Sequence, residues 1–341
     1  MKITSRARIL WMMSLLVAAA LACNGVATPP AASTPTVGNP NPQPLPPTSV
    51  SPQVDAALAP GDLPAKRADQ GGDVNSSPDA THKTVPGGDV FVNGLYERPF
   101  NANTMDKYFP YLDIVNFQGY KDDTWGYGAI TLVDTDANGK LPAKYGVELD
   151  LNKDGRGDWL ILASSPSSTT WTTQGVQAWK DTDGDVGGAK PMITDTQSPK
   201  GDGYETLAFD QGKGSNADGA WVRIASDDKK TIELAFKLSM LGSPASFSMG
   251  AWAGTDALNP AMFDFNDHMT HADAGSPLVS YTVYPLKALA EIDNTCRLAI
   301  GFAAVGNEPG LCSTLQRKPA EGAAPTNAPQ QPPPPGIVVP P

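Results

Sequence analysis

The sequence contains little histidine and cysteine, few basic residues and none of the common catalytic signatures. Its 341 residues include three histidines and three cysteines, and acidic residues outnumber basic ones by 36 to 25, which gives a net charge of −11. We find no GxSxG nucleophile elbow, no HExxH, no phosphate-binding loop and no dinucleotide fingerprint. The lack of basic clusters argues against a nucleic-acid partner. The sequence therefore favours a non-enzymatic protein.

One continuous apolar run is present, from Ile9 to Leu21, and it follows a positively charged start. It is shorter than the roughly 20 residues of a membrane-spanning helix and leads into Cys23 through small residues. This arrangement resembles the lipobox of bacterial lipoproteins, although Ala20 stands where that family most often has leucine. The resemblance implies a signal peptide over residues 1–22, a lipidated Cys23 and a lipid-anchored, extracytoplasmic location at the cell membrane or outer surface. An ordinary secretory signal or an uncleaved membrane anchor is the alternative.

The other two cysteines, Cys296 and Cys312, are compatible with export. In an oxidising compartment they are a candidate disulfide pair around a glycine- and proline-containing loop. Two unpaired buried thiols are the alternative, and the spacing excludes a CxxC type of metal site.

Composition divides the mature chain into three parts. Residues 23–86 are rich in Pro, Ala, Thr, Ser and Gly without apolar periodicity, so we expect a disordered tether after the lipidated cysteine. Residues 318–341 have the same character. Residues 87–317 carry most of the tryptophans and nearly all of the patterned sequence, which indicates one globular domain.

The sequence of this central region is typical of a β protein, with short strand-forming runs separated by turns. Short runs of β-branched, aromatic and aliphatic residues alternate with Asp/Asn/Gly turns, and Thr231–Lys237 has the clearest alternation. The expected strands are Tyr127–Val133, Tyr145–Leu151, Asp158–Ala163, Val176–Lys180, Tyr204–Phe209, Ala220–Ala225, Thr231–Lys237, Phe247–Ala253 and Leu278–Tyr284. The expected helices are short: Lys237–Leu241, Thr270–Ala274 and Leu286–Cys296. We therefore predict an all-β fold, an antiparallel β-sandwich with a few short helices.

Three acidic loops are candidate calcium sites. In DLNKDGRGD, side chains with oxygen ligands alternate with other residues on both sides of a glycine, as they do in calcium loops. The loop is not an EF-hand, because Ile161 stands where an EF-hand has its bidentate acid. Two further loops, DTDANG and DTDGDVGG, have a related pattern. The candidate ligands are Asp150, Asn152, Asp154 and Asp158 in the first loop, Asp134, Asp136 and Asn138 in the second, and Asp181, Asp183 and Asp185 in the third. Any bound calcium would be structural, and plain turn formation is the alternative.

A further polar segment is FDFNDHMTHAD. His268 and His271 with nearby carboxylates could ligate a transition metal. We favour an ordinary polar loop in which Thr270 and Asp273 form a capping box at the start of a helical turn.

Aromatic residues supply the main binding hypothesis. Flat aromatic faces stack on sugars, so Trp125, Trp171 and Trp179 are candidate glycan contacts. A domain of this size also needs large residues in its core, and we expect at least half of the aromatic residues in these segments to be buried.

Two segments, LDIVNFQGYKDDTWGYGAITL and YGVELDLNKDGRGDWLIL, resemble the opening of DOMON-like and family 9 carbohydrate-binding-module-like sandwiches. The resemblance covers residues 98–163. It implies a β-sandwich that binds sugars, haem or another small ligand, and it assigns no ligand residues here.

These observations predict a surface-anchored lipoprotein whose calcium-stabilised sandwich binds a glycan or a similar extracellular ligand. The first alternative is a structural envelope lipoprotein that binds another surface protein. The second is a glycoside-type hydrolase, which needs two carboxylates roughly 5 to 10 Å apart across a cleft.

Overall fold

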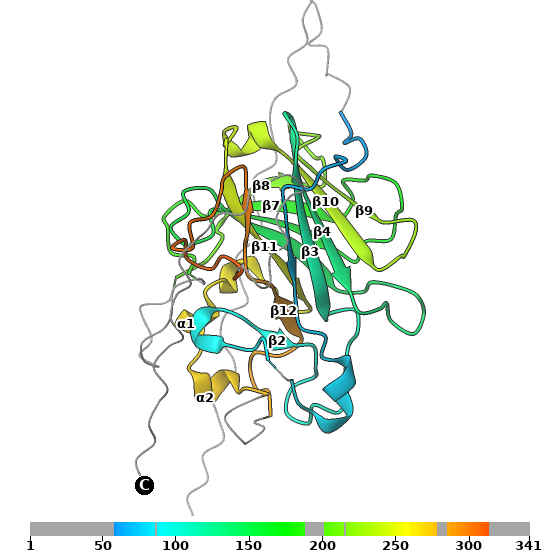
Figure 1. Ribbon diagram of the computed structural model, residues 1–341, viewed down its shortest axis with the longest axis vertical. Coiled ribbons are helices and arrows are strands. Elements are labelled where there is room, and N and C mark those ends of the chain that lie inside the picture. The colour runs from blue at the N-terminus through cyan, green and yellow to red at the C-terminus, as the bar shows by residue number, and fades with distance from the viewer. Residues whose placement is uncertain (1–57, 86, 188–200, 215, 278–284, 314–341) are drawn as a thin grey trace, which may run out of the picture. The chain divides into compact units, whose positions relative to one another are not determined.

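Two antiparallel β-sheets pack face to face (Figure 1). The computed structural model describes residues 58–85, 87–187, 201–214, 216–277 and 285–313, which all belong to one compact unit, Asp55–Pro341. The predicted all-β sandwich is confirmed. The predicted signal peptide, Cys23 and the tail over 318–341 lie outside the described residues.

The smaller sheet has five strands in the order β1-β3-β4-β10-β9, and every neighbouring pair is antiparallel. Its strands are β1 (Asp69–Gly72), β3 (Ile114–Lys121), β4 (Trp125–Leu132), β9 (Ala220–Ile224) and β10 (Thr231–Lys237).

The larger sheet has eight strands, seven of them in the order β2-β12-β11-β5-β6-β7-β8, with β13 paired to β11. Its strands are β2 (Glu97–Arg98), β5 (Lys144–Asp150), β6 (Trp159–Ser164), β7 (Val176–Lys180), β8 (Thr206–Asp210), β11 (Phe247–Gly254), β12 (Ile292–Asn294) and β13 (Leu298–Ile300).

The helices of the described chain are all six residues or shorter. The 3₁₀ helices are η1 (Ser77–His82), η2 (Phe91–Asn93), η3 (Leu238–Leu241) and η4 (Pro260–Met262), and the α-helices are α1 (Phe265–His268) and α2 (His271–Ala274). No helix in the described part of the chain is long and apolar enough to cross a membrane.

The main core lies between the two sheets. On β10, Ile232, Leu234 and Phe236 belong to this core, whereas Ala235 belongs to a different cluster on the outer face. This is the alternation that the sequence predicts for Thr231–Lys237. A second cluster, rich in aromatic residues such as Trp252 and Phe265, covers the outer face of the larger sheet. The larger sheet is therefore buried on both faces.

One predicted helix differs from the structure, and one predicted strand is not tested by it. The helix expected over Leu286–Cys296 is wrong: Ile292–Asn294 is β12, which fills the gap between β11 and β2. Leu286, Leu289 and Ile292 have helical spacing, but Leu286 packs in one hydrophobic cluster and the other two in another, so the tertiary fold overrides the local pattern. The strand expected over Leu278–Tyr284 lies outside the described residues.

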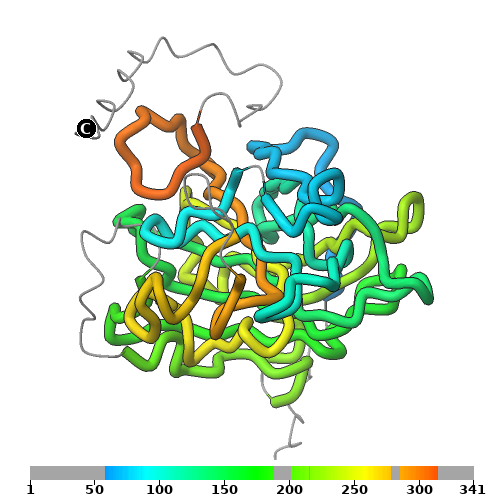
Figure 2. The backbone as a smooth tube through the Cα atoms, turned by 90° about the horizontal axis from the view of Figure 1, so that it is seen from below, coloured from blue at the N-terminus to red at the C-terminus, as the bar shows by residue number. Residues whose placement is uncertain are grey.

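The folded region also begins earlier than residue 87. Asp69–Gly72 pairs with β3, and Val85 is fully buried, although both lie in the segment expected to be a tether. The glycine-rich composition hides a strand here, because its hydrogen bonds are made by the backbone. The segment after β1 and the segment after β13 lie on the same side of the molecule, at the top of Figure 2.

The predicted disulfide between Cys296 and Cys312 is confirmed, with a Cα–Cα distance of 4.8 Å. The bond fixes the segment that follows β13 against the core, since Cys312 is buried there and a Cβ on Gly71 would lie 3.0 Å from its sulfur.

We predict that the double substitution Cys296→Ser/Cys312→Ser lowers the free energy of unfolding by about 3 kcal/mol, because a disulfide restricts the unfolded chain. Thermal unfolding should show a melting temperature lower by roughly 6–12 °C. A reductant should destabilise the native protein and have no effect on the variant. Equal melting temperatures for the two proteins would show that the bond contributes nothing.

Candidate functional site

Three aromatic residues and one alanine form a row across the outer face of the five-stranded sheet. The register pairs Tyr120 with Tyr127, Tyr127 with Ala235, and Ala235 with Trp221 on β3, β4, β10 and β9. Since neighbouring strands lie about 4.8 Å apart, these four residues extend over roughly 14 Å. We call Tyr120, Tyr127, Ala235 and Trp221 the aromatic row.

The aromatic row faces outward because glycines occupy neighbouring inward positions. A Cβ on Gly128 would lie 2.6 Å from Val147, and a Cβ on Gly119 would lie 2.5 Å from Ile300. A larger residue at either position would have to displace side chains of the opposite sheet. At these positions the strands place glycine in the core and aromatic residues outside, although Phe117 and Ile130 of the same strands still face the core.

Two of the three predicted glycan contacts adjoin the aromatic row. Trp125 and Trp171 belong to the same cluster, and the Trp171 and Tyr127 rings are 6.3 Å apart. Trp125 and Tyr127 are buried, whereas Trp171, Trp221 and Tyr120 are half-buried. The half-buried rings are the ones that a ligand could contact.

Charged groups border these rings. Arg223 forms an ion pair with Glu233 and lies over the Trp171 ring, 4.5 Å from its centre. Lys237 forms a 2.6 Å ion pair with Asp218. Such a border supplies hydrogen-bond donors and acceptors next to apolar faces.

The first described segment, residues 58–68, lies against this face. The Trp171 indole Nε1 donates a 2.9 Å hydrogen bond to the Gly61 carbonyl, and Leu63 packs against the aromatic cluster. The Leu58 backbone N–H donates to Asp218 at 3.2 Å. We call residues 58–68 the entry segment.

The third predicted contact, Trp179, lies elsewhere. It is on β7 of the larger sheet, packs against the outer aromatic cluster of that sheet and donates to Gln177 at 3.3 Å. Trp179 therefore does not share a surface with Trp171.

The Asp150 loop is closed by its own backbone and by an arginine. The fully buried Asp150 carboxylate accepts hydrogen bonds from the backbone N–H groups of Lys153 (2.6 Å) and Gly155 (2.9 Å), and its Oδ2 lies 3.4 Å from Arg297. Burial raises the pKa of Asp150, and Arg297 opposes that effect. Arg297 also pairs with Glu148 at 3.0 Å.

The other predicted ligands of the Asp150 loop also bind backbone. Asp158 accepts from the Leu151 N–H at 2.6 Å, Asn152 accepts from Asp154, and Asp154 accepts from Arg156. Within the described ranges, Asp150, Asp154 and Asp158 do not form a group of three whose oxygens all lie within 4.8 Å. Calcium binding at this loop stays a prediction.

The Asp134 loop is an exposed turn. Asp136 accepts from the backbone N–H groups of Asn138 (2.9 Å) and Lys140 (2.7 Å), and these hydrogen bonds lower its pKa although partial desolvation opposes them. Asp134 accepts from the Thr135 N–H at 2.8 Å. These contacts are those of a turn-forming sequence.

The Asp181 loop takes part in an acidic cluster that ranges from buried Asp181 to exposed Asp183. Oxygens of Asp181, Asp183 and Glu205 lie within 4.8 Å of one another, and so do oxygens of Asp183, Asp185 and Asp202. Sequence analysis found the three residues of the loop but missed Asp202 and Glu205, which are separated from it in sequence.

The electrostatics of this cluster are unfavourable without a cation. The pKa of Asp183 is raised, first by desolvation and then by Asp185 and Asp181. Asp181 and Asp185 bind backbone N–H groups at 2.7 to 3.1 Å. These bonds hold the carboxylates in place and leave Asp183 facing its acidic neighbours.

The predicted capping box is confirmed. The Thr270 side chain accepts from the Asp273 N–H at 3.1 Å, and Asp273 accepts from the Thr270 backbone at the start of α2. His271 stacks on Phe91 with the ring centres 5.5 Å apart. Among the described residues, neither His268 nor His271 belongs to a group of three metal-ligating side chains.

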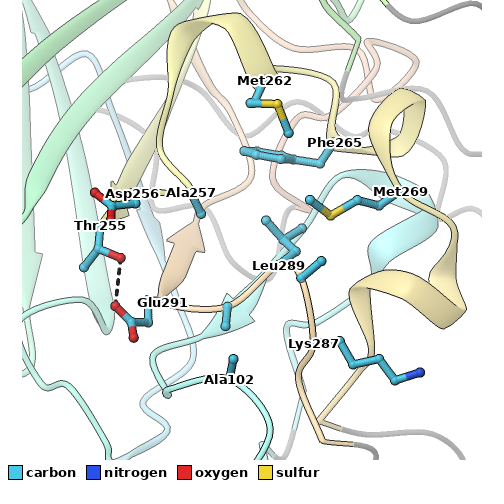
Figure 3. Close-up of a pocket in the computed structure, with 12 residues that line it drawn as sticks. Ala102, Thr255, Asp256, Ala257, Met262, Phe265, Met269, Lys287, Leu289 and Glu291 are labelled. Carbon is cyan, nitrogen blue, oxygen red and sulfur yellow. Dashed lines mark hydrogen bonds between the residues drawn. The ribbon is translucent and has the colours of Figure 1, made fainter. Parts of the chain in front are cut away.

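A pocket of about 390 Å³ lies beside α1. Figure 3 shows Phe265, Met269 and Leu289 grouped on one side of it, while the Thr255 hydroxyl donates a 2.8 Å hydrogen bond to Glu291 on the other. Nothing in the sequence analysis pointed to this pocket. It has few polar groups that converge on a ligand, so it is less suited to a glycan than the aromatic row.

Comparison with protein-family models finds no match to this chain, and neither curated proteins nor solved structures give a significant match.

We predict that Arg297→Gln destabilises the protein by about 3–5 kcal/mol at pH 8, because it leaves Glu148 and Asp150 as unpaired buried charges. The loss should be smaller at pH 5. Burial already raises the folded-state pKa of Asp150. A carboxyl group with a raised folded-state pKa stabilises the protein at low pH, and this contribution to the free energy of unfolding is lost as the pH rises through that pKa. Urea unfolding at the two pH values tests this. An equal loss at both would contradict it.

Proposed function

We propose that this protein is a surface-anchored, non-enzymatic binding module that presents the outer face of its five-stranded sheet to a glycan. The observation that carries the proposal is the aromatic row with Trp171 beside it. Half-buried aromatic rings offer flat apolar faces to sugar rings, and Tyr120, Trp171 and Trp221 are the half-buried rings on this face.

The bordering charges support a sugar ligand. Arg223 and Glu233 lie next to the Trp171 ring, and Asp218 and Lys237 lie next to the entry segment. Sugars need polar partners at their edges as well as apolar partners at their faces.

The location follows from the sequence and agrees with the cysteines. A lipidated Cys23 would hold the chain at a membrane, on the extracytoplasmic side. The disulfide between Cys296 and Cys312 is of the kind that persists in oxidising compartments.

The acids beside the aromatic row favour binding over hydrolysis. Glu233 and Asp218 are both held in ion pairs. Burial would raise the pKa of Asp218, but Lys237 and the Leu58 N–H together lower it below its ordinary value. A general acid needs a raised pKa. Binding of another surface protein through the same rings is the remaining alternative.

We propose that calcium binds at the Asp181 loop. Asp181, Asp183 and Asp185 with Asp202 and Glu205 offer several carboxylate oxygens at cation-binding separations. A calcium ion there would neutralise the cluster and hold two distant segments together.

The glycan proposal predicts that Trp171→Ala and Trp221→Ala each weaken binding about tenfold, since each removes one stacking face. A glycan array identifies the ligand, and isothermal titration measures the affinities. Trp179→Ala is the matched control, because it removes an equally half-buried tryptophan from the other sheet.

Equal losses for Trp179 and Trp171 variants would place the ligand elsewhere. An array without any bound glycan, together with a protein partner whose binding depends on Trp221, would establish the protein-binding alternative.

For the Asp181 loop, we predict that Asp183→Asn/Asp185→Asn lowers the number of calcium ions bound per chain by one, because it removes Asp183, which both groups share, and Asp185, which belongs to one of them. Asp123→Asn/Asp227→Asn is the control for the change in charge, since both residues are exposed and lie outside these groups. Calcium titration calorimetry gives the count. An unchanged count would leave these aspartates as turn residues.

A further inference from the structure

Four acidic side chains meet at one junction of the two sheets. This junction lies at the start of β3, whereas Tyr120 of the aromatic row lies near the end of that strand. Asp73 follows β1, Asp113 precedes β3, and Glu97 and Asp293 are register partners on β2 and β12. The first two strands belong to the smaller sheet and the last two to the larger. The sequence analysis singled out none of these residues, because they come from four separate segments.

The cluster is buried. The exposed fraction is 1 % for Glu97 and 0 % for Asp113 and Asp293, and Asp73 is half-buried. Within the described ranges, no arginine, lysine or histidine forms an ion pair with any of the four. Arg98, although adjacent to Glu97 in sequence, pairs with Asp89 at 2.6 Å.

Each carboxyl group has one oxygen that is held and one that is not. Glu97 Oε1 accepts from the Ser76 hydroxyl at 2.5 Å, and Asp293 Oδ2 accepts from the Ile114 N–H at 2.6 Å. The other oxygens, Asp73 Oδ2, Glu97 Oε2, Asp113 Oδ1 and Asp293 Oδ1, are buried without a hydrogen-bond partner.

The held oxygens fix the orientation of the groups. Asp113 Oδ2 accepts from the Ser76 N–H at 2.9 Å and from the Tyr108 hydroxyl at 2.6 Å, and Asp73 Oδ1 accepts from the Val74 N–H at 2.9 Å. Metal sites commonly have such a supporting layer, which holds the ligands before the ion binds.

The separations suit one ion. Asp73, Glu97 and Asp293 each offer an oxygen within 4.8 Å of the other two. Two oxygens on opposite sides of a calcium ion at about 2.4 Å are about 4.8 Å apart. No hydrogen bond joins any two of the four carboxyl groups among the described residues, so the free oxygens are not explained by shared protons.

We propose that Asp73, Glu97 and Asp293 bind one buried calcium ion that fastens β1 to β2 and β12, with the Asp113 carboxyl group next to these three ligands. An all-oxygen set without histidine or cysteine selects a hard cation. Several carboxylates in an irregular arrangement favour calcium over magnesium, which needs near-octahedral geometry and retains water.

The electrostatics agree with this assignment. Burial, followed by the neighbouring carboxylates, raises the pKa of Glu97 and Asp293 well above their ordinary values. A group in this state requires a positive partner in order to remain ionised. Calcium supplies that partner at the centre of the cluster.

The test is thermal unfolding and calcium calorimetry of the full chain with the Asp183→Asn/Asp185→Asn changes, which remove the Asp181 loop from the measurement. We expect calcium to raise its melting temperature by roughly 5–10 °C over EDTA at about 100 times the dissociation constant. Magnesium should have little effect. Adding Glu97→Gln or Asp293→Asn should lower the calcium affinity roughly 100-fold or more.

A second readout distinguishes a lost ligand from a damaged fold. In EDTA, Glu97→Gln should melt no lower than its parent, because burial and the neighbouring carboxylates already raise the pKa of Glu97 and favour its neutral form, whereas in calcium it should melt at a lower temperature. This difference between EDTA and calcium supports the site. No calcium response in the parent, or a response that Glu97→Gln and Asp293→Asn leave intact, would overturn the proposal. If these variants do not fold, the calcium response of the parent still decides, because its absence refutes the site, and one bound calcium per chain that persists in Asp150→Asn/Asp154→Asn supports it. Neither result depends on glycan binding.

Discussion

Packing of two sheets against one core is the constraint on which the other features depend. The larger sheet is buried on both faces, so its outer side carries an aromatic cluster instead of a binding surface. The smaller sheet has only its inner face in the main core. Its outer face is therefore the place where large aromatic side chains can remain half-exposed, and the inward glycines of β3 and β4 make that placement sterically feasible.

Several charged side chains are buried in this fold. Arg98 pairs with Asp89, and Arg297 pairs with Glu148 and Asp150, so these buried ions have partners of opposite sign. The junction of β1, β2, β3 and β12 departs from that rule, because four carboxyl groups meet there and none of them has an ion-pair partner among the described residues. This contrast within one molecule is the reason that we propose a bound ion there.

The sequence allowed much of the fold to be predicted, because the signal for strands is local. Thr231–Lys237 and Val176–Lys180 have the bounds expected from alternation and β propensity. Leu286–Cys296 was mispredicted, since its apolar spacing fits a helix while pairing with β11 and β2 decides its structure. Asp69–Gly72 was missed because a strand made of polar residues and glycine has no apolar pattern.

The sites could be predicted only in part, for a related reason. Trp171 could be named as a candidate contact from the sequence, but its place near Tyr127 and Trp221 depends on how the strands pair. The acidic loop was visible as a motif, whereas Glu205 reaches it from another segment. The cluster around Asp293 has no local motif at all.

The position of the entry segment has a mechanical consequence. A pull transmitted along the chain toward Leu58 first meets single contacts, the Leu58 hydrogen bond to Asp218 and the Trp171 hydrogen bond to Gly61. Only after these contacts break does the pull act on the backbone hydrogen bonds between β1 and β3. Contacts broken one at a time resist force less than a ladder that shares the load, so tension peels the segment from Trp171 while the sheets remain intact.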